Sequence, residues 1–183
     1  MSGTGRLQID LPEGWFPIDL ATREATTSAR RLVDGWIARR PALADHRERL
    51  VDLLEATSEN ARRTNCVYAA AAFGETPGVG PTYAGLAVRV LVWPGNVDVE
   101  GFLAGMAAAA RDDDGVTSAE VVQIAGRRMV LVRQVDADTG AATTSFIVPA
   151  RGRGVFVNAE FSSPAALAPE HTFAHIVGTL RVS

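Results

Sequence analysis

The sequence predicts an α+β fold, in which an antiparallel sheet ends in a four-stranded meander and is covered by helices. Within residues 116–183, four short apolar segments are separated by polar breaks. Such segments, with turn residues between them, are typical of neighbouring antiparallel strands. An amphipathic segment after Pro169 predicts a helix that packs on these strands. The expected strands cover residues 119–124, 129–135, 143–148 and 155–161.

The composition is that of an ordinary globular protein. The chain has 183 residues, of which 47% are hydrophobic and 21% are charged, and this favours a single domain over residues 1–183. No apolar run approaches the roughly 18 residues that a membrane helix needs. Residues 1–10 hold no signal-peptide core, and Cys66 is the single cysteine, so we expect a cytoplasmic protein. A net charge of −3 argues against nucleic acid or an anionic membrane as partner.

The first third of the chain predicts a short strand followed by two helices. Residues 6–11 alternate apolar and polar side chains before the turn sequence Pro12-Glu13-Gly14, and Trp15 then anchors the chain. Apolar residues recur at helical spacing in residues 24–39 and again in residues 42–63. Pro41 ends the first helix and can open the second. The link is so short that the pair, at about residues 23–63, forms an antiparallel hairpin or a sharply kinked pair.

The middle of the chain predicts two strands and a third helix. Residues 66–73 form a compact apolar run, and residues 83–93 alternate apolar with mixed side chains. Asp98 is a suitable N-cap for a helix over residues 99–111. Gly101 and Gly105 are four residues apart on this helix, and we expect them to let it approach a neighbour closely.

Both ends of the chain resemble the Mog1/PsbP-like superfamily. The opening "IDLPEGW" and the closing "FAHIVGTLRV" carry the resemblance. The matching residues are Pro12, Gly14, Trp15, Phe173, Ile176, Thr179, Leu180 and Arg181. The resemblance implies an antiparallel sheet covered by helices. It also implies a mostly non-catalytic group of proteins, which includes small-GTPase adaptors, photosystem accessory subunits, actinobacterial lipoproteins and chaperones for secretion effectors. The superfamily offers no catalytic residues and no cofactor to carry over.

The remaining chemistry-bearing residues favour structural roles. His171 and His175 have a spacing that can hold a metal, but a helical wheel places them opposite the apolar stripe, so we expect them to face solvent. Cys66, at the start of a buried strand, favours a core residue over a nucleophile. Residues 136–140 lack most calcium-loop ligands and predict a hairpin turn. The sequence therefore predicts no enzyme, no metal site and no cofactor.

Arg133 is a charged residue in the middle of a predicted strand, and a partner on the neighbouring strand would explain it. If Gly126 and Arg127 form the preceding two-residue turn, Arg133 lies directly opposite Glu120. Oppositely charged residues at facing positions of an antiparallel pair attract each other. We therefore expect an ion pair between these two side chains.

The turns of the meander separate positive from negative charge. Alternate turns lie at the same end of a meander, so four arginines gather at one end and several aspartates at the other. The arginines are Arg127, Arg128, Arg151 and Arg153. The aspartates are Asp136, Asp138 and those within residues 112–114. Guanidinium groups can dock a carboxylate-rich partner segment or a phosphate, although solvated turn tips also explain the charges. Replacing the four arginines is expected to remove partner binding without lowering thermal stability.

The function that the sequence predicts is a non-catalytic adaptor or accessory protein that binds another protein, with a secretion-type chaperone as one version. The rival is a small-molecule-binding protein, with a pocket between the helical pair and the sheet near Trp15, Trp36 and Trp93. A closed core favours the adaptor, whereas a cavity of about several hundred Å³ favours the rival. An enzyme is the third choice, because the sequence offers no convergent set of polar side chains.

Overall fold

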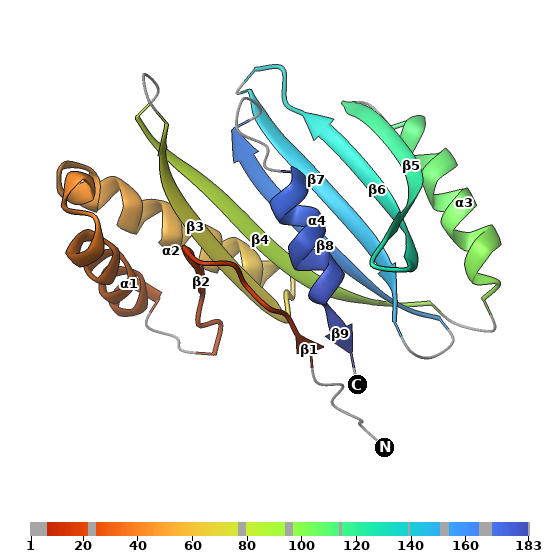
Figure 1. The fold of residues 1–183 in the computed structure, drawn as a ribbon, viewed down its shortest axis with the longest axis horizontal. Helices are drawn as coiled ribbons and strands as arrows, with labels where there is room; N and C mark the ends of the chain where they lie inside the picture. Colours follow the sequence, from red (N-terminus) through yellow and green to blue (C-terminus); the bar gives the residue numbers. More distant parts are fainter. Residues whose placement is uncertain are drawn as a thin grey trace. The chain divides into compact units, whose positions relative to one another are not determined.

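The computed structural model has an α+β fold with four α-helices and a mostly antiparallel sheet, which confirms the predicted fold class. It describes residues 7–21, 25–76, 80–93, 97–113, 115–138, 140–150, 154–164 and 170–182. The chain divides into two compact units, one of Gly14–Val88 and one of Met1–Glu13 with Arg89–Ser183. The long strand β4 (Gly80–Val92) contributes residues to both units (Figure 1). That the chain forms a single domain stays a prediction.

The unit of Gly14–Val88 packs a pair of helices on three strands. Its strands, in the order β2-β3-β4, are antiparallel neighbours. The other elements are β2 (Trp15–Pro17), α1 (Ala25–Arg39), the 3-10 helix η1 (Pro41–His46), α2 (Arg47–Arg63) and β3 (Tyr68–Thr76). The core lies where Val33 and Trp36 of α1 meet Leu50 and Leu54 of α2. The predicted helical pair is therefore present, with the six-residue 3-10 helix η1 in place of the first turns of a longer second helix.

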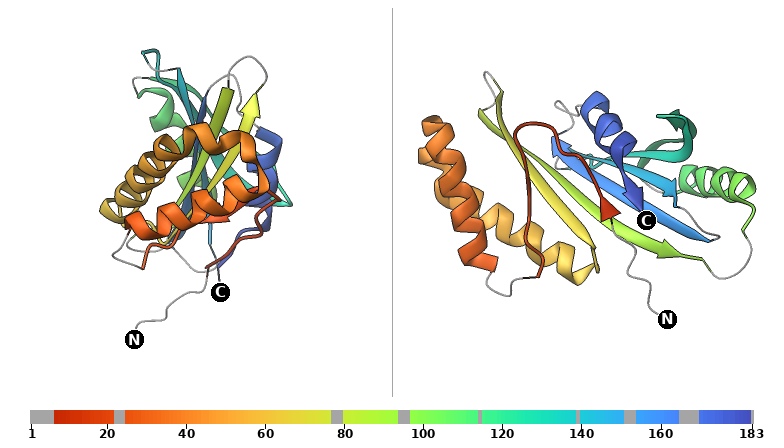
Figure 2. Two further views of the ribbon diagram at one scale, coloured as in Figure 1. Left: turned by 90° about the vertical axis from the view of Figure 1, so that its left-hand side faces the viewer. Right: turned by 60° about the horizontal axis from the view of Figure 1, so that its bottom comes forward.

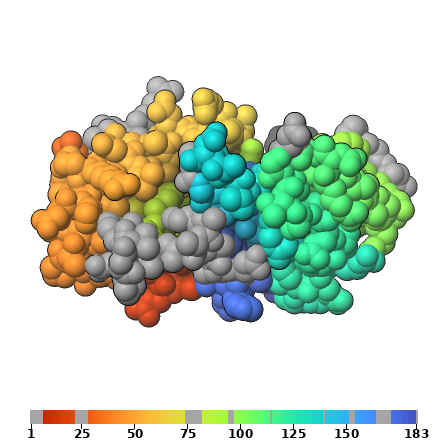
Figure 3. Space-filling view, turned by 90° about the horizontal axis from the view of Figure 1, so that it is seen from above, coloured from red at the N-terminus to blue at the C-terminus, as the bar shows by residue number. Residues whose placement is uncertain are grey.

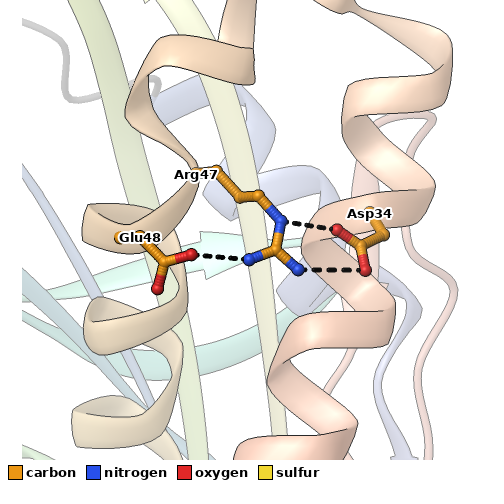
Figure 4. A network of polar contacts seen from close by, with 3 residues as sticks. All are labelled: Asp34, Arg47 and Glu48. Carbon is orange, nitrogen blue, oxygen red and sulfur yellow. Dashed lines mark hydrogen bonds and ion pairs between the residues drawn. The ribbon is translucent and has the colours of Figure 1, made fainter.

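A polar contact joins the two helices of this unit (Figure 4). The guanidinium of Arg47 donates to the carboxylate of Asp34 at 2.8 and 3.2 Å, and to Glu48 at 2.6 Å. These hydrogen bonds, first of all the one to Asp34, raise the pKa of Arg47. Because both carboxylates are exposed, this contact adds little to the stability of the fold.

The other unit contains the predicted meander. Strands β5 to β8 pair in sequence order, and the end of β4 follows β8 in the sheet. Each strand contains its predicted segment and extends beyond it. The bounds are β5 (Val116–Ile124), β6 (Arg127–Val135), β7 (Ala141–Pro149) and β8 (Val155–Pro164). A separate two-stranded sheet joins β1 (Leu7–Gln8) to β9 (Arg181–Val182).

Helices cover both faces of the meander. Helix α3 (Val99–Arg111) packs Leu103 against Val130 and Ile147, and Figure 3 shows α3 and β5 forming one continuous surface. Helix α4 (Glu170–Thr179) packs on the opposite face, where the rings of Phe161 and Phe173 stack with centroids 4.3 Å apart. Because side chains alternate along a strand, adjacent residues in β7 and β8 serve the two different cores.

The first hairpin turn of the meander differs from the predicted one by a single position. Ile124 pairs with Arg127, so the turn consists of Ala125 and Gly126, both with positive φ (50° and 75°). A two-residue turn of this kind needs positive φ at both positions, which glycine adopts readily. Glu120 therefore faces Leu131, and the predicted direct pairing with Arg133 is wrong.

The ion pair itself is present, because Arg133 Nη1 lies 2.9 Å from Glu120 Oε1 along a diagonal. Arg133 faces Ser118, which lies on the same side of β5 as Glu120, two residues along. Diagonal neighbours on one face of a sheet are within reach of a long side chain.

Helix α3 begins at the predicted cap but does not use its glycines as predicted. Asp98 accepts hydrogen bonds from the N–H groups of Glu100 and Gly101, each at 3.2 Å. Gly105 is exposed, and a Cβ added there meets nothing within 4 Å. Gly101 is also exposed, and a Cβ added there meets only atoms of Asp98. The expectation of a close helix approach at these glycines is therefore wrong.

Candidate functional site

The two described arginines at the predicted arginine end have different surroundings. Arg127 opens β6, and its guanidinium donates to the backbone carbonyls of Val177 (2.7 Å), Leu180 (2.9 Å) and Gly178 (3.2 Å). These carbonyls belong to the last turn of α4 and the residue that follows it, where carbonyls lack partners within the helix. Arg128, the next residue, points outward and forms an ion pair with Glu100 of α3. Arg151 and Arg153 lie outside the described residues.

A second arginine, Arg181 of β9, lies beside Arg127. Its Nη1 donates to the carbonyls of Gly178 and Leu180, both at 2.9 Å. Two of the three carbonyls that Arg127 contacts are therefore shared with Arg181. Burial lowers the pKa of Arg127, and the charge of Arg181 lowers it further. A guanidinium is so strong a base that Arg127 keeps its positive charge near neutral pH despite this lowering.

A pocket of about 200 Å³ opens between these two arginines. Its lining combines the end of β7, the residue after α4, and β9 with the start of β6. The lining residues are Arg127, Pro149, Ala150, Leu180, Arg181 and Val182. Four of these six side chains are apolar and two are cationic. The pocket therefore suits a small group that carries both apolar surface and negative charge.

Neither arginine of the pocket has a carboxylate partner among the described residues. The ion pairs in that part of the chain involve Arg47, Arg89, Arg128 and Arg133. Among the described residues, Arg127 uses its two Nη atoms on the end of α4 and the residue after it, and Arg181 uses its Nη1. A guanidinium has five N–H donors, so each group retains donors that can bind a carboxylate. The site therefore has a net positive charge that the described part of the protein does not neutralise.

No sequence pattern identifies Arg181 as a site residue. It entered only as a match to the closing signature of the Mog1/PsbP-like superfamily. Strand β9 has two residues, which is too short to show an alternating pattern. Its place beside Arg127 follows from the contacts of Arg127 with the end of α4, and no local pattern predicts contacts between such distant residues.

The opposite end of the meander carries the predicted aspartate turn. Asp136 accepts a hydrogen bond from the Asp138 N–H at its Oδ1 (2.9 Å) and one from the Gly140 N–H at its carbonyl (2.8 Å). Gly140 has a φ of 65°, which glycine adopts without strain. These contacts confirm the hairpin turn that was favoured over a calcium loop. Asp112 and Asp113 follow α3 and are exposed.

The three tryptophans of the rival pocket do not share one environment. Trp36 is buried, with its ring centroid 4.0 Å from that of Phe73 and 5.1 Å from that of Phe16. Trp15 lies in β2, half-buried, in the same unit. Trp93 belongs to the other unit, where it meets Phe102 edge-on at 5.0 Å. Trp36 therefore serves as a core side chain of its unit.

The cavity described beside the helical pair is very small. It has a volume of about 10 Å³ and lies next to Ile18, with Leu32 of α1 and Leu54 of α2 in its lining. A cavity must offer about 10–15 Å³ to hold a single water molecule. Its volume is therefore more than tenfold below the several hundred Å³ that a small-molecule site needs.

The histidines and the cysteine occupy ordinary positions. His171 and His175 are exposed on α4, while Phe173 and Ile176 are buried, which confirms the predicted helix orientation. Cys66 is half-buried, with its Sγ 3.4 Å from Thr64 Oγ1. In the described ranges, no group of three or more His, Cys, Asp or Glu side chains is placed to hold a metal ion. No helix in those ranges is both long enough and apolar enough to cross a membrane.

Comparison with known proteins adds little about this site. No protein-family model matches the chain, and no curated protein matches it. Among solved structures, a crystal structure of a protein from Bacteroides thetaiotaomicron VPI-5482 is similar over 97% of this chain, with 9% sequence identity and a TM-score of 0.44. The chain spans 45% of the length of that protein. A similarity at this level carries no argument about function.

Proposed function

We propose that the protein is a non-catalytic adaptor or accessory protein, which binds a partner protein through a carboxylate held between Arg127 and Arg181. One observation carries the proposal: two guanidinium groups share a pocket without a carboxylate partner in the described part of the chain. A carboxylate is planar and matches the fork of a guanidinium, so a bidentate contact is both strong and specific.

The apolar lining of the pocket favours a protein segment over a bare anion. Pro149, Leu180 and Val182 can contact an apolar side chain or backbone while the arginines hold the charge. A volume of about 200 Å³ admits one carboxylate-bearing side chain or a chain terminus, and not a large metabolite. Cytoplasmic location, membership of the Mog1/PsbP-like superfamily and a chaperone role in secretion are parts of this proposal.

The test is site-specific crosslinking in the native cell. A photoreactive amino acid replaces Val182, which lines the pocket, and crosslinked partners are identified by mass spectrometry. The same experiment is repeated with Arg181→Glu and with Arg49→Glu as the control. Arg49 is an exposed arginine of α2, so both substitutions change the net charge equally.

We expect one partner to crosslink at its acidic side chain or carboxyl end in the unmodified and Arg49→Glu proteins. Arg181→Glu should reduce its yield about tenfold or more, because a repulsive carboxylate replaces an attractive guanidinium. The thermal melting temperature of each variant shows whether it remains folded. Equal crosslinking by a folded Arg181→Glu variant would show that the pocket is not the binding site.

A further inference from the structure

Strand β4 continues beyond the end of its neighbour β3. The pairing of these strands runs from Thr76 with Gly80 to Tyr68 with Val88. Strand β4 then continues to Val92, and Figure 2 shows it running past β3. Among the described residues, no strand pairs with residues 89–92 on the side that β3 occupies earlier in the strand.

The backbone groups of Val90 and Val92 face this open edge. The carbonyl of Val88 accepts a hydrogen bond from the Val67 N–H at 2.8 Å, so the backbone of Val88 points toward the β3 side. Alternate residues of a strand point their backbone groups to the same edge. The N–H of Trp93 donates to the Gly154 carbonyl at 2.6 Å, on the other edge. Val90 and Val92 therefore present their N–H and C=O groups to the open edge.

The side chains along this edge are unusually apolar and exposed. The exposed fractions are 40% for Val90, 37% for Leu91, 74% for Val92 and 51% for Trp93. Natural proteins protect open strand edges with charges, prolines or covering loops, because such edges pair with other strands. The stretch from Val90 to Trp93 carries no charge and no proline. It therefore has both features of a strand-addition site, which are backbone groups that pair with no described strand and apolar side chains.

We propose that this edge pairs with the same edge of a second copy of the chain, antiparallel and centred on Leu91. In that register Val90 lies opposite Val92 of the second copy, and Val92 lies opposite Val90. Both residues point their backbone groups at the edge, so each facing pair exchanges two hydrogen bonds. The two copies of Leu91 then meet on the two-fold axis as a pair without hydrogen bonds between them.

The flanking residues make the edge complementary to itself. In the same register, Arg89 of each copy lies opposite Trp93 of the other, on the same face of the sheet. A guanidinium over an indole ring is the most favourable cation–aromatic pair, and the two-fold axis supplies it twice. Arg89 forms an ion pair with Glu160 of β8, on the other side of β4, so its guanidinium must turn toward the edge to reach the indole of the second copy. No two like charges face each other across the axis, so a second copy fits better than a strand of unrelated sequence.

The proposed interface is small, so we expect a reversible dimer. Only a few residues of each copy take part, so the surface area that each copy buries is below the roughly 800 Å² per partner of a standard stable interface. Sedimentation velocity from about 10 µM to about 1 mM covers the range in which small interfaces associate. The unmodified protein should shift from monomer to dimer with concentration, and Val92→Lys should stay monomeric throughout, because it places two charges at the edge.

Val135→Lys is the matched control for the charge. Val135 is also exposed, but it lies on β6, which is paired with a neighbouring strand on each side. This variant should dimerise like the unmodified protein. A protein that is monomeric over the whole range, or a Val92→Lys variant that still dimerises, overturns the proposal.

Disulfide trapping tests the register independently of affinity. In a Cys66→Ser background, Leu91→Cys places two thiols on the two-fold axis, where Cα atoms of a facing pair lie about 4.5 Å apart and permit a disulfide. Val90→Cys faces Val92 of the other copy and should not crosslink to itself. We expect fast covalent dimerisation of Leu91→Cys alone. Equal crosslinking of the two variants, or none, contradicts the register and overturns the proposal.

This surface shares no residue with the pocket beside Arg127 and Arg181. The proposal of a dimer and the proposal of a partner site can therefore be disproved independently of each other. Arg181→Glu should leave the sedimentation behaviour unchanged, and Val92→Lys should still crosslink its partner.

Discussion

At the scale of single residues, Arg127 and Arg128 show how two adjacent arginines take opposite roles. Successive side chains of a strand point to opposite faces. Arg127 therefore points to the end of α4, where it binds three carbonyls, and Arg128 points to solvent and to Glu100. Arg127 therefore links β6 to the end of α4, whereas Arg128 forms an exposed ion pair on the surface.

This difference gives a matched pair of substitutions. Arg127→Met removes charged donors from three carbonyls and should lower the free energy of unfolding by about 2–3 kcal/mol. Arg128→Met removes an exposed ion pair and should cost less than about 1 kcal/mol. Urea unfolding of both variants at neutral pH measures the difference. Equal losses would show that the contacts of Arg127 with α4 add nothing. The contacts of Arg127 with α4 therefore argue against replacing all four arginines without loss of stability, and this pair of variants tests that expectation.

The sequence located Arg127 correctly at an end of the meander but gave no hint of its contacts. The carbonyls that it binds lie 50, 51 and 53 residues further along the chain. The periodicity of apolar residues predicts which face of a strand is buried, but it does not predict which distant helix end the strand contacts. The ion pair between Arg133 and Glu120 was found despite an error in the turn, because a long side chain reaches diagonal neighbours as well as direct ones.

At the scale of elements, helix α3 shows a cap that depends on a glycine. The Asp98 carboxylate bonds to the N–H groups of Glu100 and Gly101. A Cβ added at Gly101 would lie 2.7 Å from Asp98 Oδ2, so a side chain at this position must displace the cap. Gly105, one turn later, has open space around it. The two glycines therefore differ in purpose although both are exposed.

Alanine substitutions distinguish them. Gly105→Ala should stabilise the protein by about 0.5–1 kcal/mol, because alanine loses less backbone entropy in a helix. Gly101→Ala makes the same entropic gain but loses the cap, which is worth about 1 kcal/mol, so its net effect should be zero or destabilising. Thermal unfolding of both variants checks this. An equal gain from the two substitutions would mean that the cap is dispensable.

Elements were predicted well where their signal is local. The helix at residues 99–111 and its cap were both found, because a cap and an apolar stripe are visible within one segment. The strands of the meander were predicted too short, since a strand ends where its partner ends and not where its apolar residues end. Strand β9 was missed for the same reason, because its partner β1 lies at the other end of the chain.

At the scale of the whole molecule, two compact units share one strand. Strand β4 supplies residues to both units, and each unit has a core of its own. If the part of β4 in one unit loses its hydrogen bonds to neighbouring strands, the part of β4 in the other unit is also destabilised. We therefore expect the units to unfold together, as the single domain predicted from the sequence requires.

Hydrogen exchange tests this expectation. Leu54→Ala, in the core of the Gly14–Val88 unit, should cost about 2–5 kcal/mol, as buried leucines do. If the chain is one cooperative unit, the slowest amides of both units should lose the same protection. Leu103→Ala, in the core of the other unit, is the reciprocal control. Loss of protection in the substituted unit alone would show two independent domains.

The pairing of β1 with β9 has a consequence for how the protein reaches its native state. A hydrogen bond from the Asp10 N–H to Thr179 Oγ1 joins residues 169 positions apart, beside that pairing. Contacts between such distant residues carry the largest loop-closure cost and slow folding. Leu180, Arg181 and Val182 line the pocket and depend on this late contact. We therefore expect the pocket to be among the last features to form, so that a partly folded chain would have its core but not the proposed site.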